Sequence, residues 1–234
     1  MTLYIMHYLT RMFLFFLFFL LYNESMKRKY IYFLILFVFG ISFLVLYFFW
    51  PKKQYSNSDF GINDIASSSD YDNDGIDDYT DIYLGALEYV KTRPKYKSKY
   101  YNGGYPDDEY GVCTDVVAFA FLNAGYNLRD MVNEDIINNR DSYDITNIDS
   151  NIDFRRVKNL KVFFDRNAIK LSNDINDYES FQKGDIVVFN KHIAIISEYR
   201  NKKGIPYIIH NSGNYRYVED GLSRYNIIGH YRWN

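Results

Sequence analysis

The only cysteine of the chain is Cys113, which stands near the start of the segment "GVCTDVVAFAF" (residues 111–121). A polar, glycine-marked turn runs there into an apolar segment, so the thiol falls in the first turn of a predicted helix. Unpaired backbone N–H groups and the positive end of the helix dipole both favour a thiolate at such a position. The sequence therefore predicts Cys113 as a nucleophile, and a small buried core residue is the alternative interpretation.

A cysteine nucleophile usually needs a histidine as base and a third group that orients the base. His192 and His210 fall on two strand-like segments separated by "RNKKG" (200–204). A hairpin centred near Asn201 would place the two histidines directly opposite each other, with Cβ atoms about 4.5–5.5 Å apart. We predict His192 as the base and His210 as the orienting residue. A register slip of one residue would give the third role to Asn211.

The remaining two histidines are not expected to take part in catalysis. His230, within "GHYRW", is predicted to be structural, and His7 lies in the N-terminal extension. Histidines at strand ends are commonly plain surface residues. The assignment of His192 therefore depends on its pairing with His210 and on the helix-start cysteine.

An acidic segment, "DYDNDGIDDYTD" (residues 70–81), has the spacing of a calcium-binding loop. Loop positions one, three, five, six, seven, nine and twelve are filled, in order, by Asp70, Asp72, Asp74, Gly75, Ile76, Asp78 and Asp81. The carboxylates and the Ile76 carbonyl would hold a structural Ca²⁺, and Gly75 permits the sharp turn. Asp81 replaces the usual longer glutamate, which favours weak affinity of roughly 10⁻⁴–10⁻³ M. A solvated acidic linker is the alternative.

The elements that must position these residues indicate an α+β fold. A helix should follow the acidic loop, and a second one, apolar almost all round and therefore buried, should run from Val112 to the helix stop at Gly125. The mixed region 126–180 contains two possible helices, and four strand-like segments come after Gly184, at 185–189, 192–199, 206–211 and 227–233. Helices first and strands later predict an antiparallel sheet.

The N-terminal part predicts a membrane anchor. Residues 30–50, "YIYFLILFVFGISFLVLYFFW", are 21 uncharged residues, close to the roughly 20 needed to cross a bilayer as a helix. Lys27, Arg28 and Lys29 precede them, which places the N-terminus in the cytoplasm and residues 51–234 outside the cell. We predict a single-pass signal anchor in the cell membrane. A cleaved signal peptide is the alternative, although its apolar region would normally span about 7–15 residues.

The expected organisation follows from these segments. A cytoplasmic N-terminus (1–29) precedes the transmembrane helix (30–50), a linker (51–69), the calcium loop (70–81) and a catalytic domain (82–234). "MKRKY" at Met26 looks like the true start, which makes residues 1–25 an extension from a misplaced start; a re-entrant or second short span over residues 12–22 is the alternative. Residues 54–234 carry 28 acidic and 21 basic side chains. That net negative charge excludes a generally basic nucleic-acid-binding protein.

Several segments are similar to the bacterial family called domain of unknown function 1287. The similarity covers about residues 80–234, and "GVCTDVV" is its most specific part. The segments that carry it are "NGGYPDDEYGVCTDVVAFAFLNAGYNLRDMVNEDI", "NIDFRRVKNLKVFFDR", "GDIVVF", "HIAIIS", "IPYIIHN" and "GHYR".

More distantly, the order of a helix-start cysteine, a strand histidine and a polar residue on the next strand resembles the NlpC-type, papain-like cell-wall cysteine peptidases. That resemblance implies a papain-like fold with Cys113 as nucleophile, His192 as base and His210 as orienting residue. Two features depart from the NlpC-type pattern. Thr114 and Asp115 replace its small Ser-Gly pair, and the 79 residues from Cys113 to His192 exceed its usual interval, which implies an inserted subdomain.

The expected function is a membrane-anchored, extracytoplasmic cysteine hydrolase that acts on amide bonds. Location and resemblance together imply peptidoglycan peptides as substrate, and no cofactor is expected for catalysis. The backbone N–H of Cys113 and one further donor would bind the oxyanion. Two alternatives remain open: a non-catalytic, calcium-ordered cell-wall-binding module in which Cys113 is inert, and a cysteine acyltransferase that uses the same nucleophile.

Overall fold

The computed structural model describes residues 11–12, 28–49 and 54–233. The chain divides into two compact units, residues 1–53 and 54–234. In the first unit, helix α2 spans Arg28–Phe49 and covers almost all of the predicted anchor; most of residues 1–25 and Trp50 lie outside the described residues. Within the described residues, no helix is long and apolar enough to cross a membrane. The signal anchor at 30–50 therefore stays a prediction.

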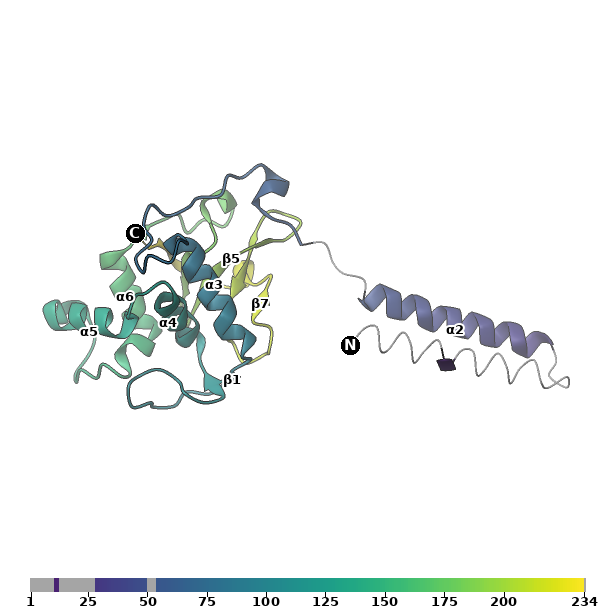
Figure 1. Cartoon of the computed structure of the whole chain (residues 1–234), viewed down its shortest axis with the longest axis horizontal. Coiled ribbons are helices and arrows are strands. Elements are labelled where there is room, and N and C mark those ends of the chain that lie inside the picture. Colours follow the sequence, from purple (N-terminus) through teal and green to yellow (C-terminus); the bar gives the residue numbers. More distant parts are fainter. Residues whose placement is uncertain (1–10, 13–27, 50–53, 234) are drawn as a thin grey trace. The chain divides into compact units, whose positions relative to one another are not determined.

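The second unit contains four α-helices among the described residues (Figure 1). They are α3 (Asp78–Lys91), α4 (Cys113–Asn123), α5 (Leu128–Asn138) and α6 (Val157–Asn167). The helix predicted after the acidic loop is present as α3, but it begins at Asp78, so its first turn lies within the acidic segment 70–81. Helix α4 begins at the cysteine, and α5 and α6 occupy the two segments of the mixed region that the sequence indicates as possible helices.

The second unit also contains a six-stranded antiparallel sheet with strand order β3-β8-β4-β5-β6-β7. Its strands are β3 (Ile169–Lys170), β4 (Ile186–Phe189), β5 (His192–Arg200), β6 (Pro206–Ile209), β7 (Val218–Glu219) and β8 (Ile227–Arg232). Two further short strands, β1 (Lys95–Tyr96) and β2 (Tyr110–Gly111), form a parallel pair. The predicted α+β class and antiparallel sheet are confirmed.

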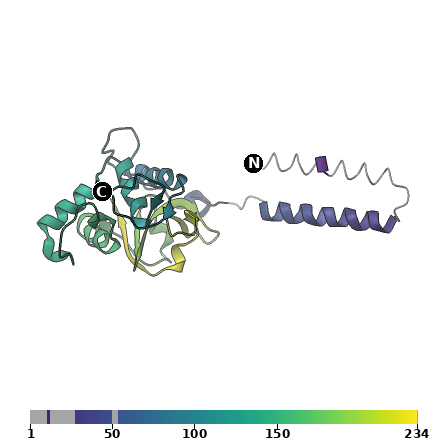
Figure 2. The same ribbon diagram turned by 90° about the horizontal axis from the view of Figure 1, so that it is seen from below.

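Helices α3 and α4 pack on each other and against β5, on one face of the sheet (Figure 2). They approach closely at Gly85, where an added Cβ atom would lie 2.4 Å from the Cβ atom of Asn123 and 3.0 Å from the backbone of Ala120. The side chains of α4 are buried on almost every side, which agrees with its apolar sequence. Cys113 is therefore carried by a helix held between α3 and the sheet.

The sheet is covered on both faces. Ile186, Val188 and Ile193 belong to the large core under the helices. Val187 and Ala194, which alternate with them along β4 and β5, belong to a second, smaller cluster. Because successive side chains of a strand point to opposite faces, the two clusters lie on opposite sides of the sheet. The second cluster comprises Phe181, Val187, Phe189, Ala194, Ile196, Ile208 and Leu222.

Part of the predicted linker is held against the sheet. Tyr55 forms an antiparallel bridge with Arg200 at the end of β5, and the Asn57 amide donates to Gln182 at 2.9 Å. The Arg200 guanidinium is buried, and besides Asn57 it donates to the carbonyl groups of residues 178, 181 and 204. The segment from residue 54 therefore contributes partners to a buried charge, which its polar composition does not reveal.

Candidate active site

Cys113 occupies the first position of α4 and is only 3% exposed. The residue before the helix is Val112, whose backbone N–H donates to Asp115 Oδ2 at 2.7 Å. A carboxylate at this position satisfies one of the backbone donors that a helix start leaves unpaired. Asp115 therefore caps the helix.

A buried ion pair holds this helix start in place. Arg155, from the short helix η3 (Asp153–Arg155), donates from Nε to Asp115 Oδ1 at 2.6 Å and from Nη2 to Asp115 Oδ2 at 2.9 Å. Both side chains are at most 1% exposed. Thr114 donates its hydroxyl to the carbonyl of Arg155 at 3.3 Å. The two residues that replace the small Ser-Gly pair of NlpC-type peptidases are thus anchored to η3, a contact that the sequence analysis missed.

The thiol itself does not match the expected thiolate. Burial raises the pKa of Cys113 to about 11, and the charge of Asp115 acts in the same direction. Backbone N–H groups of Ile193, Thr114 and Cys113 oppose this rise. The N–H of Ile193 belongs to β5, so the sulfur lies against the strand residue that follows His192. In the substrate-free protein Cys113 is a neutral thiol at neutral pH.

His192 and His210 are brought together, as predicted. His192 Nε2 lies 2.6 Å from His210 Nδ1, and the ring centroids are 4.9 Å apart with an interplanar angle of 75°. His192 is the first residue of β5. His210 follows directly after β6 and is fully buried.

The strand register that led to this pair was wrong. Ile195 pairs with Ile209 and Ile196 with Ile208, so His192 is not directly opposite His210. At the turn the pair Arg200–Pro206 is four residues away from the predicted register, and the irregularity between Ile196 and Arg200 reduces the difference to two residues. A shift of two residues keeps the same side chains on the same face. The two imidazoles therefore still meet, as diagonal neighbours.

A carboxylate extends the histidine pair into a chain. Glu219, at the end of β7, lies with Oε1 3.0 Å from His210 Nε2. Its other oxygen accepts from Arg224 Nη2 at 2.8 Å. Neither residue has a signal in the sequence, because a strand of two residues has no hydrophobic period and nothing in "YVEDGL" pairs Glu219 with a histidine. The chain runs from His192 through His210 and Glu219 to Arg224.

Charge and burial set the protonation of this chain. Burial lowers the pKa of His192 to about 4, and His210 contributes to this fall. Burial also lowers the pKa of His210, although Glu219 opposes the change. Burial alone would raise the pKa of Glu219, but Arg224 and His210 bring it below its ordinary value. Both imidazoles are therefore neutral at neutral pH, and Glu219 is ionised.

The hydrogen-bond network assigns the tautomers. An ionised Glu219 can only accept, so His210 carries its proton on Nε2 and leaves Nδ1 as an acceptor. His192 must then donate from Nε2 to His210 Nδ1. Nδ1 of His192 is left with a lone pair, which is the requirement for a base.

A hollow of about 370 Å³ opens beside the base. His192 and Tyr225 lie on its wall with ring centroids 6.1 Å apart. The lining residues are Phe189, Asn190, Lys191, His192, Tyr225 and Asn226. The hollow lies at the β4–β5 turn from which His192 projects.

Asn211, the alternative third residue, has a different role. Its amide Nδ2 donates to the carbonyl of Pro94 at 3.0 Å and to that of Gly111 at 3.2 Å. Gly111 precedes the start of α4 by two residues. Asn211 therefore fastens the loop that leads to Cys113, and His210 is the residue that contacts the base.

His230 lies within a separate buried network. Its Nε2 is 3.0 Å from Asp185 Oδ2 and its Nδ1 is 2.7 Å from the carbonyl of Ser172. The ring stacks on Phe181 at a centroid distance of 4.0 Å, and Arg232 also pairs with Asp185. These contacts fit the structural role predicted for His230.

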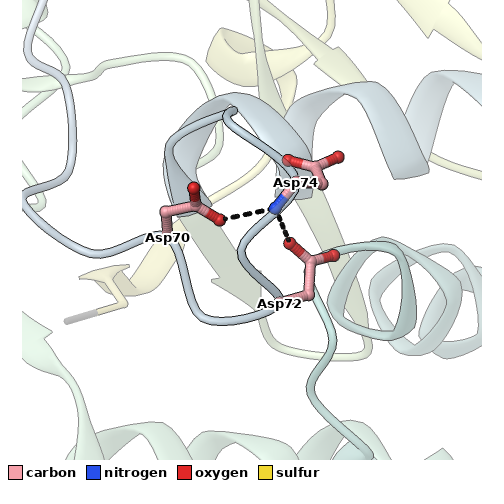
Figure 3. A group of neighbouring side chains, drawn as sticks. All are labelled: Asp70, Asp72 and Asp74. Atoms are coloured by element: carbon pink, nitrogen blue, oxygen red, sulfur yellow. Dashed lines mark hydrogen bonds between the residues drawn. The ribbon is translucent and has the colours of Figure 1, made fainter.

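The acidic loop gathers three of its predicted ligands. Oxygen atoms of Asp70, Asp72 and Asp74 lie within 4.8 Å of one another (Figure 3). The backbone N–H of Asp74 donates to Asp70 Oδ1 at 3.1 Å and to Asp72 Oδ1 at 3.3 Å. The N–H groups of Gly75 and Ile76 donate to Asp70 and Asp74. These bonds curl the backbone around the three carboxylates.

The two remaining predicted carboxylates are buried at the start of α3. Asp78 accepts from the Tyr71 N–H at 2.9 Å and from the Tyr126 hydroxyl at 2.6 Å. Asp81 is 2% exposed, and its Oδ2 has no hydrogen-bond partner among the described residues. Burial, reinforced by the neighbouring carboxylates, raises the pKa of Asp81 to about 6. The acidic segment thus combines three carboxylates near the surface with two buried carboxylates in the first turn of α3.

Comparison with known proteins places these residues in a family context. Residues 83–233 match the family described as Domain of unknown function (DUF1287). The chain is 36% identical over 149 residues to "Uncharacterized protein YijF" of Escherichia coli (strain K12), an alignment covering 60% of this chain and 72% of that protein. No solved structure matches the chain. The matched region contains Cys113 and the His192–His210–Glu219 chain, whereas the acidic loop lies before it.

Proposed function

This chain belongs to the DUF1287 family, and from its site we propose that it is a membrane-anchored, extracytoplasmic cysteine hydrolase of amide bonds. The observation that carries the proposal is that the chain His192–His210–Glu219 begins one residue before Ile193, whose backbone N–H contacts the Cys113 sulfur at the start of α4. A base, an orienting group and a carboxylate behind them form the set that a thiol nucleophile needs. The NlpC-type resemblance and a papain-like core rest on the same arrangement.

The proposed reaction requires the His192 imidazole to reach the Cys113 thiol. Nδ1 of His192 then takes the thiol proton as Sγ attacks the carbonyl carbon of an amide, because burial disfavours a free thiolate at this site. The tetrahedral intermediate collapses as His192 gives the proton to the leaving amine. The thioester that remains is hydrolysed when His192 takes a proton from water and the hydroxide displaces Sγ. His192 returns this proton to the thiolate, so the enzyme is regenerated and the products are an amine and a carboxylic acid.

The histidine–carboxylate chain supports the charged stage of this reaction. When His192 becomes an imidazolium, its Nε2–H points at His210 Nδ1, and His210 in turn donates to an anionic Glu219. The negative charge at the end of the chain stabilises the developing positive charge. The oxyanion would be bound by the backbone N–H of Cys113, at the positive end of α4, together with a second donor.

Peptidoglycan peptides are the proposed substrate. The predicted anchor over residues 30–50 would place the second unit outside the cell, where this polymer is found, and the NlpC-type resemblance points to the same amides. The hollow beside His192 would receive the peptide. A cysteine acyltransferase would use the same residues up to the thioester, and it differs only in passing the acyl group to an acceptor other than water.

One observation favours a second candidate. Cys113 is 3% exposed and its pKa is raised, as for an inert buried thiol. This is the property expected of a non-catalytic, calcium-ordered cell-wall-binding module. We favour the hydrolase because such a module gives no reason to bury a histidine pair against an ionised glutamate.

The experiment that separates these functions is digestion of purified peptidoglycan by the full-length protein in mild detergent, with the released fragments identified by mass. A hydrolase releases fragments with a new carboxylate and a new amine. An acyltransferase yields fragments joined to an acceptor, and a binding module sediments with the polymer and releases nothing. Cys113→Ala is the matched control, and it should abolish release in the first two cases.

A further inference from the structure

The strongest unexplained feature outside the active site is the side chain of Asp81. It lies in the first turn of α3, is 2% exposed, and has an Oδ2 atom without a hydrogen-bond partner among the described residues. Buried polar atoms in folded proteins nearly always have a partner, and a buried carboxylate without one is costly. This oxygen therefore points to a ligand that is not part of the chain.

The surroundings of Asp81 identify the charge of that ligand. Asp81 follows a loop on which oxygen atoms of Asp70, Asp72 and Asp74 lie within 4.8 Å of one another, and Asp78 is buried one helical turn before it. Arginine and lysine side chains form no ion pair with any of these five acids among the described residues. Carboxylates crowded in this way repel one another unless a cation lies between them.

We propose that Asp81 completes a Ca²⁺ site with Asp70, Asp72 and Asp74, and that the bound ion clamps the acidic loop to the C-terminal end of the helix that carries Cys113. All the side-chain ligands are oxygen atoms, which suits a hard cation. Several ligands on one curled loop suit the larger and more adaptable coordination of Ca²⁺ better than the strict octahedron of Mg²⁺. The absence of histidine and cysteine from the cluster disfavours Zn²⁺.

Contacts between the loop and the end of α4 support this clamp. Asn123, the last residue of α4, donates to the carbonyl of Asp81 at 3.1 Å. The rings of Tyr71 and Tyr126 stack with a centroid distance of 4.2 Å, and the Tyr126 hydroxyl donates to Asp78. The loop that would hold the metal thus already rests on the residues that end α4.

Gly125 permits this close approach. Its φ of +79° suits glycine, and an added Cβ atom would lie 2.9 Å from the Cβ atom of Asp72. Any side chain here would push the loop away from α4. A cation that draws Asp70, Asp72 and Asp74 towards Asp81 would therefore tighten the packing of α3 on α4 from the end opposite to Cys113.

Binding is tested directly on the full-length protein in mild detergent. Terbium, a luminescent substitute for Ca²⁺, should emit when tyrosine is excited, because Tyr71 belongs to the loop. Ca²⁺ should displace it with an affinity of roughly 10⁻⁴–10⁻³ M, and Mg²⁺ at the same concentration should not. The proposal is overturned if wild-type protein gives no saturable terbium signal or if Mg²⁺ competes as well as Ca²⁺.

The role of Asp81 is tested by Asp81→Asn, which keeps the shape of the side chain. The affinity for Ca²⁺ should fall at least about tenfold. This is the lower end of the loss in metal affinity that follows when residues supporting metal ligands are substituted. In chelator, the variant should melt no lower than wild type, because the repulsion is relieved. Asp107→Asn, an exposed acid outside the loop, is the matched control and should leave affinity unchanged. Equal affinity in Asp81→Asn and wild type would remove Asp81 from the site.

The clamp is tested separately by amide hydrogen exchange. Ca²⁺ should slow amide hydrogen exchange in the wild-type protein at the start of α3 and also at residues 123–126. Protection confined to residues 70–76 would show that the ion orders the loop alone, and the clamp would then be wrong. Both readouts are independent of catalysis, so failure of the proposed hydrolase would leave this test intact.

Discussion

Nε2 of His192 lies 2.6 Å from Nδ1 of His210, and the far nitrogen of His210 lies 3.0 Å from the carboxylate of Glu219. This relationship fixes the tautomer of each imidazole and leaves Nδ1 of His192 available as a base. The residue that orients the base is thus itself oriented by a buried acid.

Removal of the Glu219 charge should weaken the base without removing it. Glu219→Gln lets the side chain donate to His210, which reverses the direction of the hydrogen-bond chain, so kcat should fall about tenfold or more, approaching the 10²–10⁴-fold contribution of general base catalysis. The acidic limb of the pH dependence of kcat should also shift. Asp220→Asn, the neighbouring exposed acid, is the control. A loss of stability with an unchanged pH profile would give Glu219 a merely structural role.

Substitutions of His210 and Asn211 should affect different measurements, turnover for His210 and folding stability for Asn211. His210→Ala should lower kcat but leave some activity, whereas His192→Ala should abolish turnover. Asn211→Ala should act mainly on stability, because its amide fastens the loop at Pro94 and Gly111. The two sets of measurements are turnover and urea unfolding. If Asn211→Ala lowers kcat more than His210→Ala at equal stability, the third residue is Asn211.

The thiol of the resting protein should react slowly at neutral pH. Burial raises the pKa of Cys113 to about 11, so alkylation by iodoacetamide should increase towards alkaline pH instead of persisting below neutrality. Protein unfolded in urea should give the ordinary thiol pKa of about 8.5. The pH dependence of alkylation, read by mass, decides this point. A folded-state profile at or below that of the unfolded chain would mean that the thiolate is preformed.

Burial of His192 should make folding stability fall in mild acid. Its pKa is about 4 in the folded protein against 6.5 ordinarily, so the unfolded chain binds the proton more readily between these values. The stabilisation is complete above about pH 6.5 and is lost as pH falls towards 4, by up to about 3 kcal/mol. Burial of His210 acts in the same direction. Urea unfolding at several pH values checks this, and a wild-type slope no steeper than that of His192→Gln would contradict it.

The buried pair Asp115–Arg155 should be far more important for folding than a surface pair. Asp115→Ala leaves the Arg155 charge buried and the start of α4 uncapped, so the free energy of unfolding should fall by about 3–5 kcal/mol. The exposed pair Lys158–Asp144 is the control, and Asp144→Ala should cost about 0–1 kcal/mol. Urea unfolding of the two variants gives the comparison. Similar losses would show that the buried pair has no special role in holding the cysteine.

The sequence predicted the elements well wherever a period was long enough to read. The apolar run after Cys113 could only be a buried helix, and the four strand-like segments after Gly184 became the central strands of the sheet. The pairing of His192 with His210 was predicted from a register that was two residues off. It survived because an even shift preserves the face of each side chain.

The parts that escaped prediction depend on contacts between distant segments. Glu219 stands on a strand of two residues, and Arg155 on a single short turn, so neither has a local signal. The same holds for Asn57, whose polar surroundings indicate a linker although its side chain contacts buried Arg200. The pKa of Cys113 was missed for a related reason, because helix position is readable from sequence and the depth of burial is not.

The most direct test of the central claim is the detection of an acyl group on Cys113 during turnover. Full-length protein would be mixed with peptidoglycan fragments, quenched in acid after short times, and digested for peptide mass analysis. The account predicts a transient thioester on the peptide that contains Cys113, absent from Cys113→Ala and not formed by His192→Ala. Release of fragments at the wild-type rate by Cys113→Ala, or no adduct and no release by the wild-type protein, would contradict it.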